Sequence, residues 1–206
     1  MLTYEQTLDA DLTYAFAEGS RYFERRSLGH DTLRRLAATL TDLEVDYAIV
    51  GAFAMFYHGY RRFTHAIDLI VTPAGLTKAR CCLNSAGYQL GEREHHLLDL
   101  QTGVSIKFLV SGTSSMAGGH LIVDVPQPND ASLEIDGIRF ISIAGLLKLK
   151  LASGQVPYRL RDHADVQSII QTLNLPEDFA DGFEPALREI FREYWGYAQI
   201  AAKDDY

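Results

Sequence analysis

The chain has 206 residues, 47% of them hydrophobic, with a formal net charge of −8 at pH 7 and an isoelectric point near 5.3. This is enough material for one domain with a substantial buried core, with or without a helical appendage. The net negative charge argues against non-specific nucleic-acid binding and against attraction to anionic membranes, although it does not exclude local basic patches. No stretch is apolar enough over roughly 18 residues to span a membrane, and the N-terminal residues carry acids where a signal peptide would not. We therefore expect a cytoplasmic protein.

The two cysteines, Cys81 and Cys82, are adjacent in the sequence. Neighbouring cysteines rarely form a relaxed disulfide, so they do not indicate a cross-linked secreted scaffold. We expect both to be reduced and at least one to be buried in the core.

The N-terminal part of the sequence predicts helices. Residues 4–18 carry apolar side chains at helical spacing, and a charged, glycine-containing break follows over residues 18–30. Asp31 predicts the N-cap of a second helix over residues 32–43. We interpret residues 1–30 as an N-terminal helical extension.

The next segment alternates between strands and helices. Residues 45–51 read as a buried strand, 52–60 as a short helix and 66–71 as a second strand. Thr72, followed by a proline, predicts the start of a third helix, which closes near Gly87.

The remainder predicts a small sheet and then helices. Residues 96–100 and 104–110 are separated as in a hairpin, whereas residues 112–131 are too rich in Gly, Ser and Pro to assign. Asp136-Gly137 between two short apolar segments is the strongest hairpin signal in the chain. Everything from residue 144 onward has helical periodicity.

These elements predict an α/β (α+β) protein with a mixed sheet flanked by helices and a helical C-terminal part. We expect a core over residues 31–143 and a helical region over residues 144–206.

The segment Arg62 to Val71, RFTHAIDLIV, raises the central question about function. In a strand, a residue and its second neighbour point to the same face, so an Asp-x-Asp pair would place two carboxylates side by side. Such a pair suits two magnesium ions that clamp the oxygens of a phosphoryl or nucleotidyl transfer. Here Asp68 is present, but Ala66 stands where the other acid would be.

The stretch YAIVGAFAMFYHGYRRFTHAIDLIVTPAGL resembles the minimal nucleotidyltransferase superfamily, especially AbiEii-like and related toxin-type proteins with Gly-Gly, Arg-x-Thr and Asp-x-Asp motifs. LLDLQTGVSIKFLVSG resembles the strand that carries the family's third carboxylate. DGIRFISIAGLLKLKLASG and YRLRDHADVQSII resemble its hairpin and helical end, so the resemblance covers roughly residues 45–175. It implies the nucleotidyltransferase fold, a magnesium cofactor and a nucleotide substrate.

The resemblance assigns roles only where residues match. Asp68 corresponds to the second acid of the pair, which implies a catalytic, metal-binding residue, and Ala66 marks a degenerate position. Lys107 aligns with the third acid. The implied substrate-binding positions are Gly51, Ala52 in place of the second glycine, Arg62, Thr64, Lys107 and Lys150, and two later acids of the family match Asp162 and Asp165.

Three acids would give the site a charge of −3, whereas Ala66, Asp68 and Lys107 together carry no net charge. A divalent cation would lose two anionic ligands and meet an ammonium group, so magnesium is doubtful here. We therefore hypothesise that the fold is retained and that metal-dependent transfer is lost. Lys107 could instead pair with Asp68 or present positive charge to a phosphate, allowing nucleotide binding without turnover.

Two other functions stay open. One is an active nucleotidyltransferase that modifies a protein or RNA, with Asp68 as the main metal ligand and another acid, such as Asp99 or Asp124, completing the site. The other is a structural or interaction protein whose cleft is filled by side chains. A protein partner in a toxin-antitoxin or defence-like setting follows from the resemblance alone, and the sequence does not give the oligomeric state.

Several orientations are also undecided by the sequence. Lys107 could face the cleft or solvent, and Lys148 and Lys150 could be ordinary exposed helix residues. Arg159, Arg161 and Asp162 could form no more than a charge pair at a helix start. The histidines, including His95 and His96, match no metal-ligand spacing, so we expect no zinc site.

Overall fold

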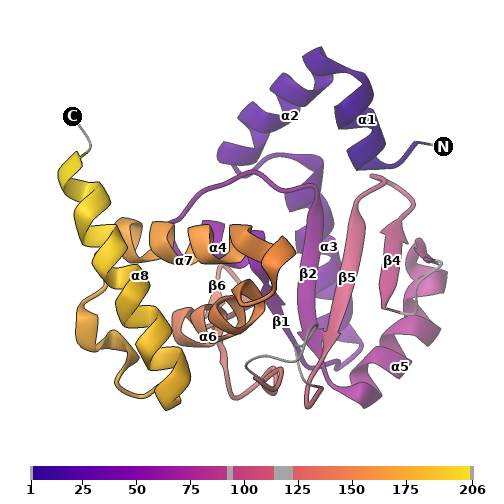
Figure 1. The fold of residues 1–206 in the computed structure, drawn as a ribbon. Helices are drawn as coiled ribbons and strands as arrows, with labels where there is room; N and C mark the ends of the chain where they lie inside the picture. Colours follow the sequence, from indigo (N-terminus) through magenta and orange to yellow (C-terminus); the bar gives the residue numbers. More distant parts are fainter. Residues whose placement is uncertain (1, 92–94, 114–122, 205–206) are drawn as a thin grey trace.

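The structure is a computed structural model and describes residues 2–91, 95–113 and 123–204 (Figure 1). Its helices are α1 (Tyr4–Ala10), α2 (Leu12–Phe23), α3 (Leu28–Asp42), α4 (Gly51–Tyr57), α5 (Pro73–Leu83), α6 (Ile143–Gly154), α7 (Leu160–Leu173) and α8 (Pro185–Asp204). Its strands are β1 (Tyr47–Val50), β2 (Ala66–Val71), β3 (Tyr88–Leu90), β4 (His96–Asp99), β5 (Ser105–Val110), β6 (Ser132–Ile135) and β7 (Ile138–Ile141). Short 3-10 turns cover Asn84–Ala86, Pro157–Arg159 and Glu177–Ala180.

The strands form one mixed sheet in the order β3-β4-β5-β2-β1-β7-β6. The central strand β2 pairs antiparallel with β1 and parallel with β5, and β1 pairs parallel with β7. Strands β1 and β2 are almost entirely buried, as expected for central strands covered on both faces. The α/β class with a mixed sheet flanked by helices, predicted from the sequence, is thus confirmed.

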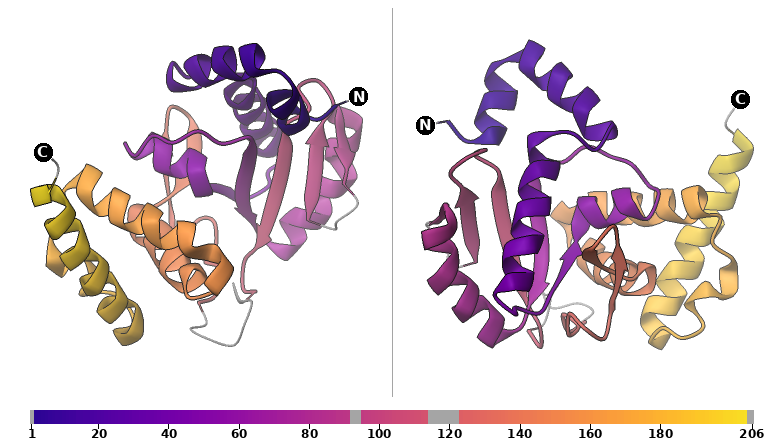
Figure 2. Two further views of the ribbon diagram at one scale, coloured as in Figure 1. Left: turned by 45° about the horizontal axis from the view of Figure 1, so that its top comes forward. Right: turned by 180° about the vertical axis from the view of Figure 1, so that it is seen from behind.

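Helices cover both faces of the sheet. Figure 1 shows α6, α7 and α8 gathered on one side of the molecule, packed against one another. The view from behind in Figure 2 shows α3 lying across the opposite face. Helices α1 and α2 lie at one end of the sheet, where the Tyr4 amide donates to the Gly103 carbonyl in the β4–β5 turn at 2.9 Å. Buried Tyr4 and Tyr22 belong to the same apolar cluster as the central strands and Phe191. The proposed divisions at residues 30 and 143 stay predictions.

The helical segment expected over residues 4–18 is present, but it is divided between two helices. The chain breaks at Asp11, whose extended backbone ends α1 and whose carboxylate caps α2 by accepting from the Tyr14 amide at 3.0 Å. Helix α2 then continues to Phe23, through part of the segment interpreted as a break, and Leu12 and Phe16 are exposed. Helical spacing of apolar residues therefore did not identify a buried face here.

The next helix begins earlier than predicted. Its N-cap is Ser27, whose hydroxyl accepts from the His30 amide at 3.3 Å, and Asp31 lies inside the first turn paired with Arg34. Strand β3 was not anticipated. The cysteines are free, but Cys81 is exposed and Cys82 half-buried, so the expected core cysteine is also wrong.

Two local signals were read correctly. Thr72 caps α5 through its hydroxyl, with a proline at the first helical position, and Gly87 ends the following turn in the left-handed conformation. Asp136 and Gly137 both have positive φ, as a two-residue type I′ hairpin between β6 and β7 requires. No helix in the described part of the chain has the length and apolar character needed to cross a bilayer.

Candidate nucleotide site

A cavity of 1120 Å³ opens between the sheet and the C-terminal helices. Strands β1, β2 and β5 form one wall, and α6, the turn before α7 and the start of α7 form the other. Its volume is slightly above the range of about 300–1,000 Å³ that is typical of small-molecule sites, so a small organic ligand fits in it. The cavity is lined by Asp68, the implied catalytic residue, and by all of the implied substrate-binding positions: Gly51, Ala52, Arg62, Thr64, Lys107 and Lys150.

Parallel pairing of β2 with β5 places Asp68 directly beside Lys107, and Ala66 beside Ser105. Since alternate strand residues share a face, these four side chains lie on the same face of the sheet. Lys107 therefore faces the cavity rather than solvent. Ala66 is 5% exposed and is not among the described residues that line the cavity, so the strand that would carry two carboxylates presents one.

Gly51 fits against Asp68 because it has no side chain. It follows β1 with φ of +65°, and a Cβ atom at this position would lie 2.7 Å from Asp68 Oδ2. Both the left-handed backbone and the close carboxylate demand glycine. The match of Gly51 to a family glycine thus has a physical reason in this chain, whereas Ala52 is buried in the first turn of α4.

Burial raises the pKa of Asp68 above its ordinary value, while the positive charges of Lys107, Lys150, Arg159 and Arg62 oppose the rise. Within the described residues, neither Asp68 nor Lys107 makes a hydrogen bond or ion pair that would occupy it. The two neighbours therefore act on each other through space, and the Lys107 ammonium remains available to an anion in the cavity.

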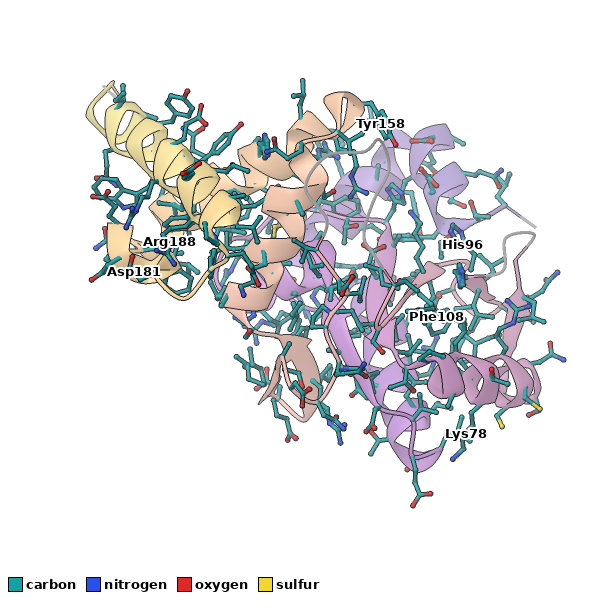
Figure 3. All side chains as sticks on the ribbon, turned by 60° about the horizontal axis from the view of Figure 1, so that its bottom comes forward. Lys78, His96, Phe108, Tyr158, Asp181 and Arg188 are labelled. Atoms are coloured by element: carbon teal, nitrogen blue, oxygen red, sulfur yellow. The ribbon has the colours of Figure 1, made fainter. Side chains whose placement is uncertain are left out.

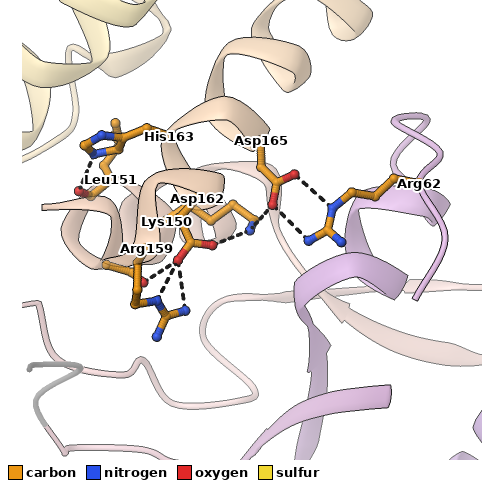
Figure 4. A network of polar contacts seen from close by, with 8 residues as sticks. Arg62, Lys150, Leu151, Arg159, Asp162, His163 and Asp165 are labelled. Atoms are coloured by element: carbon orange, nitrogen blue, oxygen red, sulfur yellow. Dashed lines mark hydrogen bonds and ion pairs between the residues drawn. The ribbon is translucent and has the colours of Figure 1, made fainter. Parts of the chain in front are cut away.

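A network of ion pairs joins the two walls (Figure 4). Arg62, from the segment between α4 and β2, donates through Nε and Nη2 to the two oxygens of Asp165 on α7, at 2.9 and 3.0 Å. Lys150 on α6 donates to Asp165 at 2.7 Å and to Asp162 at 2.9 Å. Arg159 completes the network by donating to Asp162 at 2.9 Å.

The network decides orientations that the sequence left open. Lys150 is 6% exposed and directed at the two acids, whereas Lys148 pairs with Glu184 on the far side of α6. Arg159 and Asp162 do form a charge pair, but as part of the cavity wall. Burial acts to raise the pKa of Asp162, but Lys150, the Ser153 hydroxyl and Arg159 together hold this pKa below its ordinary value.

The lining is strongly cationic for an acidic protein. Among the described residues, five cationic side chains line the cavity against two carboxylates, those of Asp68 and Asp162. The cations are Arg62, Lys107, Lys150, Arg159 and Arg161. Such a concentration of positive charge in a recess attracts anionic ligands.

The donor set does not fit a two-magnesium site. Magnesium in such sites is held by carboxylates, and this face of the sheet presents Asp68 next to an ammonium group. No group of three His, Cys, Asp or Glu side chains within the described residues could hold a metal ion. Asp162 is engaged by three side chains.

The acids considered as replacements lie elsewhere. Asp99 is on the opposite face of the sheet, where Thr32 and Thr102 donate to its carboxylate and Arg35 pairs with it. Asp124 is exposed and lies outside the cavity lining, although its neighbour Val125 contributes to it. Neither acid completes a carboxylate set with Asp68 in this structure.

Some lining residues were not singled out by the sequence. Ser153 and Tyr158 come from α6 and from the turn before α7, and Tyr158 is 77% exposed at the mouth of the cavity. Phe108, on the sheet, lines it as well (Figure 3). His95 also lies in the lining, alone rather than in a histidine cluster. Hydrophobic periodicity alone does not reveal residues of this kind, because they meet only after α6 and α7 pack on the sheet.

Comparisons with known proteins identify the fold. No protein-family model matches the sequence, and no curated protein matches it. Among solved structures, the chain is similar to an antigenic nucleotidyltransferase-like protein from Paracoccidioides brasiliensis, with a TM-score of 0.53 and 17% identity over 84% of this chain and 89% of that one. It is also similar to ANT(2″)-Ia in complex with adenylyl-2″-tobramycin, with a TM-score of 0.52 and 14% identity over 80% of this chain and 97% of that one. The chain therefore has the nucleotidyltransferase fold.

Proposed function

We propose that this protein binds a nucleotide or a related polyphosphate in the cavity between β2, β5 and α6, and that it does so without a pair of magnesium ions. In this proposal metal-dependent nucleotidyl transfer is lost. The observation that carries it is the register that places Lys107 beside Asp68, with Ala66 at the position of the first acid of the pair.

The first step of the argument concerns the phosphates. In an active two-metal site, cations neutralise the oxygens of the triphosphate. Here the Lys107 ammonium occupies the neighbouring strand position, and Arg159 and Arg161 add positive charge from the opposite wall. Direct charge-assisted hydrogen bonds from these side chains can replace the metal in binding, though not in activating an attacking group.

The second step concerns the class of ligand. ANT(2″)-Ia has been solved with adenylyl-2″-tobramycin, a nucleotide joined to a polycationic aminoglycoside. The cavity of the present chain offers five cations against two acids, which repels a free aminoglycoside and attracts phosphate. We therefore propose a polyanionic ligand and not an aminoglycoside acceptor.

The test is calorimetric titration with ATP, inorganic tripolyphosphate and tobramycin, each with EDTA and with magnesium. We expect ATP and tripolyphosphate to bind in EDTA and tobramycin not to bind. Replacing the ammonium group by Lys107→Met should weaken both phosphate ligands by about tenfold, the effect of one charged hydrogen bond. Lys78→Met is the matched control, because Lys78 is exposed on α5 and lies outside the cavity lining (Figure 3).

Three results would contradict the proposal. ATP binding that occurs only with magnesium would mean that Asp68 finds other metal ligands. Transfer of a labelled nucleotide to a protein or RNA would mean that the site is active. Absence of binding by every phosphate ligand would instead favour an interaction protein. An AbiEii-like subtype, a toxin-antitoxin setting, a protein partner and a cytoplasmic location depend on the sequence resemblance and stay predictions.

A further inference from the structure

One carboxylate occupies a complete set of anion donors on the cavity wall. Asp162 accepts from Lys150 Nζ at 2.9 Å, from Ser153 Oγ at 2.5 Å and from Arg159 Nε at 2.9 Å. Arg159 Nη2 also approaches the same carboxylate oxygen, at 2.9 Å, so the guanidinium group engages it with two nitrogens. An ammonium group on one oxygen of this carboxylate and a hydroxyl and a guanidinium group on the other are also the donors that proteins use to bind phosphate.

Asp162 differs from the second acid of the network in its position. The Asp162 side chain is 13% exposed and lines the cavity, whereas the Asp165 side chain is 3% exposed and lies behind the lining. Asp165 binds Arg62 and Lys150 from the interior, so it orients these cations. Asp162 binds its donors from within the cavity lining, to which Lys150, Ser153 and Arg159 also belong.

We infer that the donors around Asp162 form a phosphate subsite, and that Asp162 is a resident anion that a phosphoryl group of the ligand replaces. The inference rests on the proposed phosphate-binding function and adds that the Asp162 carboxylate competes with the ligand for the same donors. Displaced Asp162 stays in the first turn of α7, where a negative charge remains favourable, and it can turn into the open cavity.

Competition of this kind selects the ligand. An isolated phosphate gains only the donors that Asp162 gives up, so the exchange brings little net free energy. A polyphosphate can take these donors and reach Lys107 on the opposite wall with the same molecule, which raises the effective concentration of its second phosphate. The structure thus assigns to Asp162 a role in excluding small anions.

The test compares Asp162→Asn with the parent protein, using calorimetric titration of inorganic phosphate and tripolyphosphate in EDTA. The asparagine has the same shape and lacks the charge, so we expect it to bind inorganic phosphate at least about tenfold more tightly than the parent does. Asp162→Ser, which also removes the carboxylate, should likewise bind inorganic phosphate more tightly than the parent does. Chemical unfolding of each variant establishes that it is folded under the conditions of the titration.

Asp165→Asn is the matched control, since it neutralises the other acid of the same network. It should bind phosphate no more tightly than the parent, because Arg62 loses the acid that orients it and Lys150 loses one of its two acids while Asp162 still occupies the donors. If both folded Asp162 variants bind phosphate and tripolyphosphate no better than a parent that does bind tripolyphosphate, the resident-anion inference is overturned and the proposed function survives. If neither the parent nor the Asp162 variants bind any phosphate ligand, the proposed function fails and the inference fails with it.

Discussion

Lys107 is the direct neighbour of Asp68 in the parallel pairing of β2 with β5, and both side chains face the same cavity. A residue that would extend a carboxylate cluster instead brings an ammonium group to it. The side chains of Asp68 and Lys107 together carry no net charge, so the centre of the site lacks the negative charge that a metal ion requires.

Restoring the two acids should restore metal dependence. In the double variant Ala66→Asp with Lys107→Asp, three carboxylates would share one face of β2 and β5, which is the ligand type that magnesium prefers. We expect ATP binding by this variant to require magnesium, measured by titration with and without EDTA. Ala66→Asp alone is the control and should remain independent of magnesium, because Lys107 still opposes the metal. A double variant that binds ATP equally well in EDTA would show that the two positions do not form a metal site.

Gly51→Ala should destabilise the fold through the carboxylate beside it. The alanine must adopt φ of +65° and place its Cβ atom 2.7 Å from Asp68 Oδ2, so we expect the free energy of unfolding to fall by about 2 kcal/mol or more. Gly137→Ala is the control, since Gly137 has φ of +76° and no atom within 4 Å of the added Cβ. Urea unfolding of both variants separates backbone strain from the clash. Equal losses would mean that contact with Asp68 contributes nothing.

Asp165→Asn should remove much of the interaction between the walls of the cavity. The substitution removes the charged partner of Arg62 and leaves buried Lys150 with Asp162 alone, and breaking a buried pair of this kind lowers the free energy of unfolding by about 3 kcal/mol. Asp181→Asn breaks the exposed Arg192–Asp181 pair and should lower it by no more than about 1 kcal/mol. Thermal and urea unfolding measure both. A loss for Asp165→Asn as small as that for Asp181→Asn would contradict the structural role given to the network.

Asp68→Asn should make the protein more stable at neutral pH. Burial raises the pKa of Asp68 in the folded protein above its value in the unfolded chain, so ionised Asp68 opposes folding. The stability associated with its protonated form is present below the unfolded pKa, roughly 3.9, and is lost as the pH rises through the folded pKa. The free energy of unfolding of the variant should therefore increase relative to that of the parent as the pH is raised. Urea unfolding from acidic to neutral pH measures this difference. A parent that is more stable than the variant at neutral pH would mean that the surrounding cations lower the pKa of Asp68 by more than burial raises it.

The sequence by itself predicted most of the elements that carry the site. The strand containing Asp68, the Thr72 cap and the Asp136-Gly137 hairpin depend on alternation and on local backbone preferences, which act over a few residues and can be read directly. The same local patterns failed at the N-terminus. Ser27 and not Asp31 caps α3, Asp11 caps a separate helix α2, and the apolar spacing of Leu12 and Phe16 did not correspond to a buried face.

The chemistry of the site was only partly encoded in the order of residues. The sequence supplied Ala66, Asp68 and Lys107 and their expected alignment, but it could not decide whether Lys107 faces inward. The register of β2 with β5 decides that, because parallel strands joined by a long crossover meet through pairing between distant segments. Packing of α6 and α7 against the sheet likewise decides that Lys150 is buried between Asp162 and Asp165. Local propensity determines that successive strand residues point to opposite faces of the sheet. The tertiary fold determines which residues each face meets.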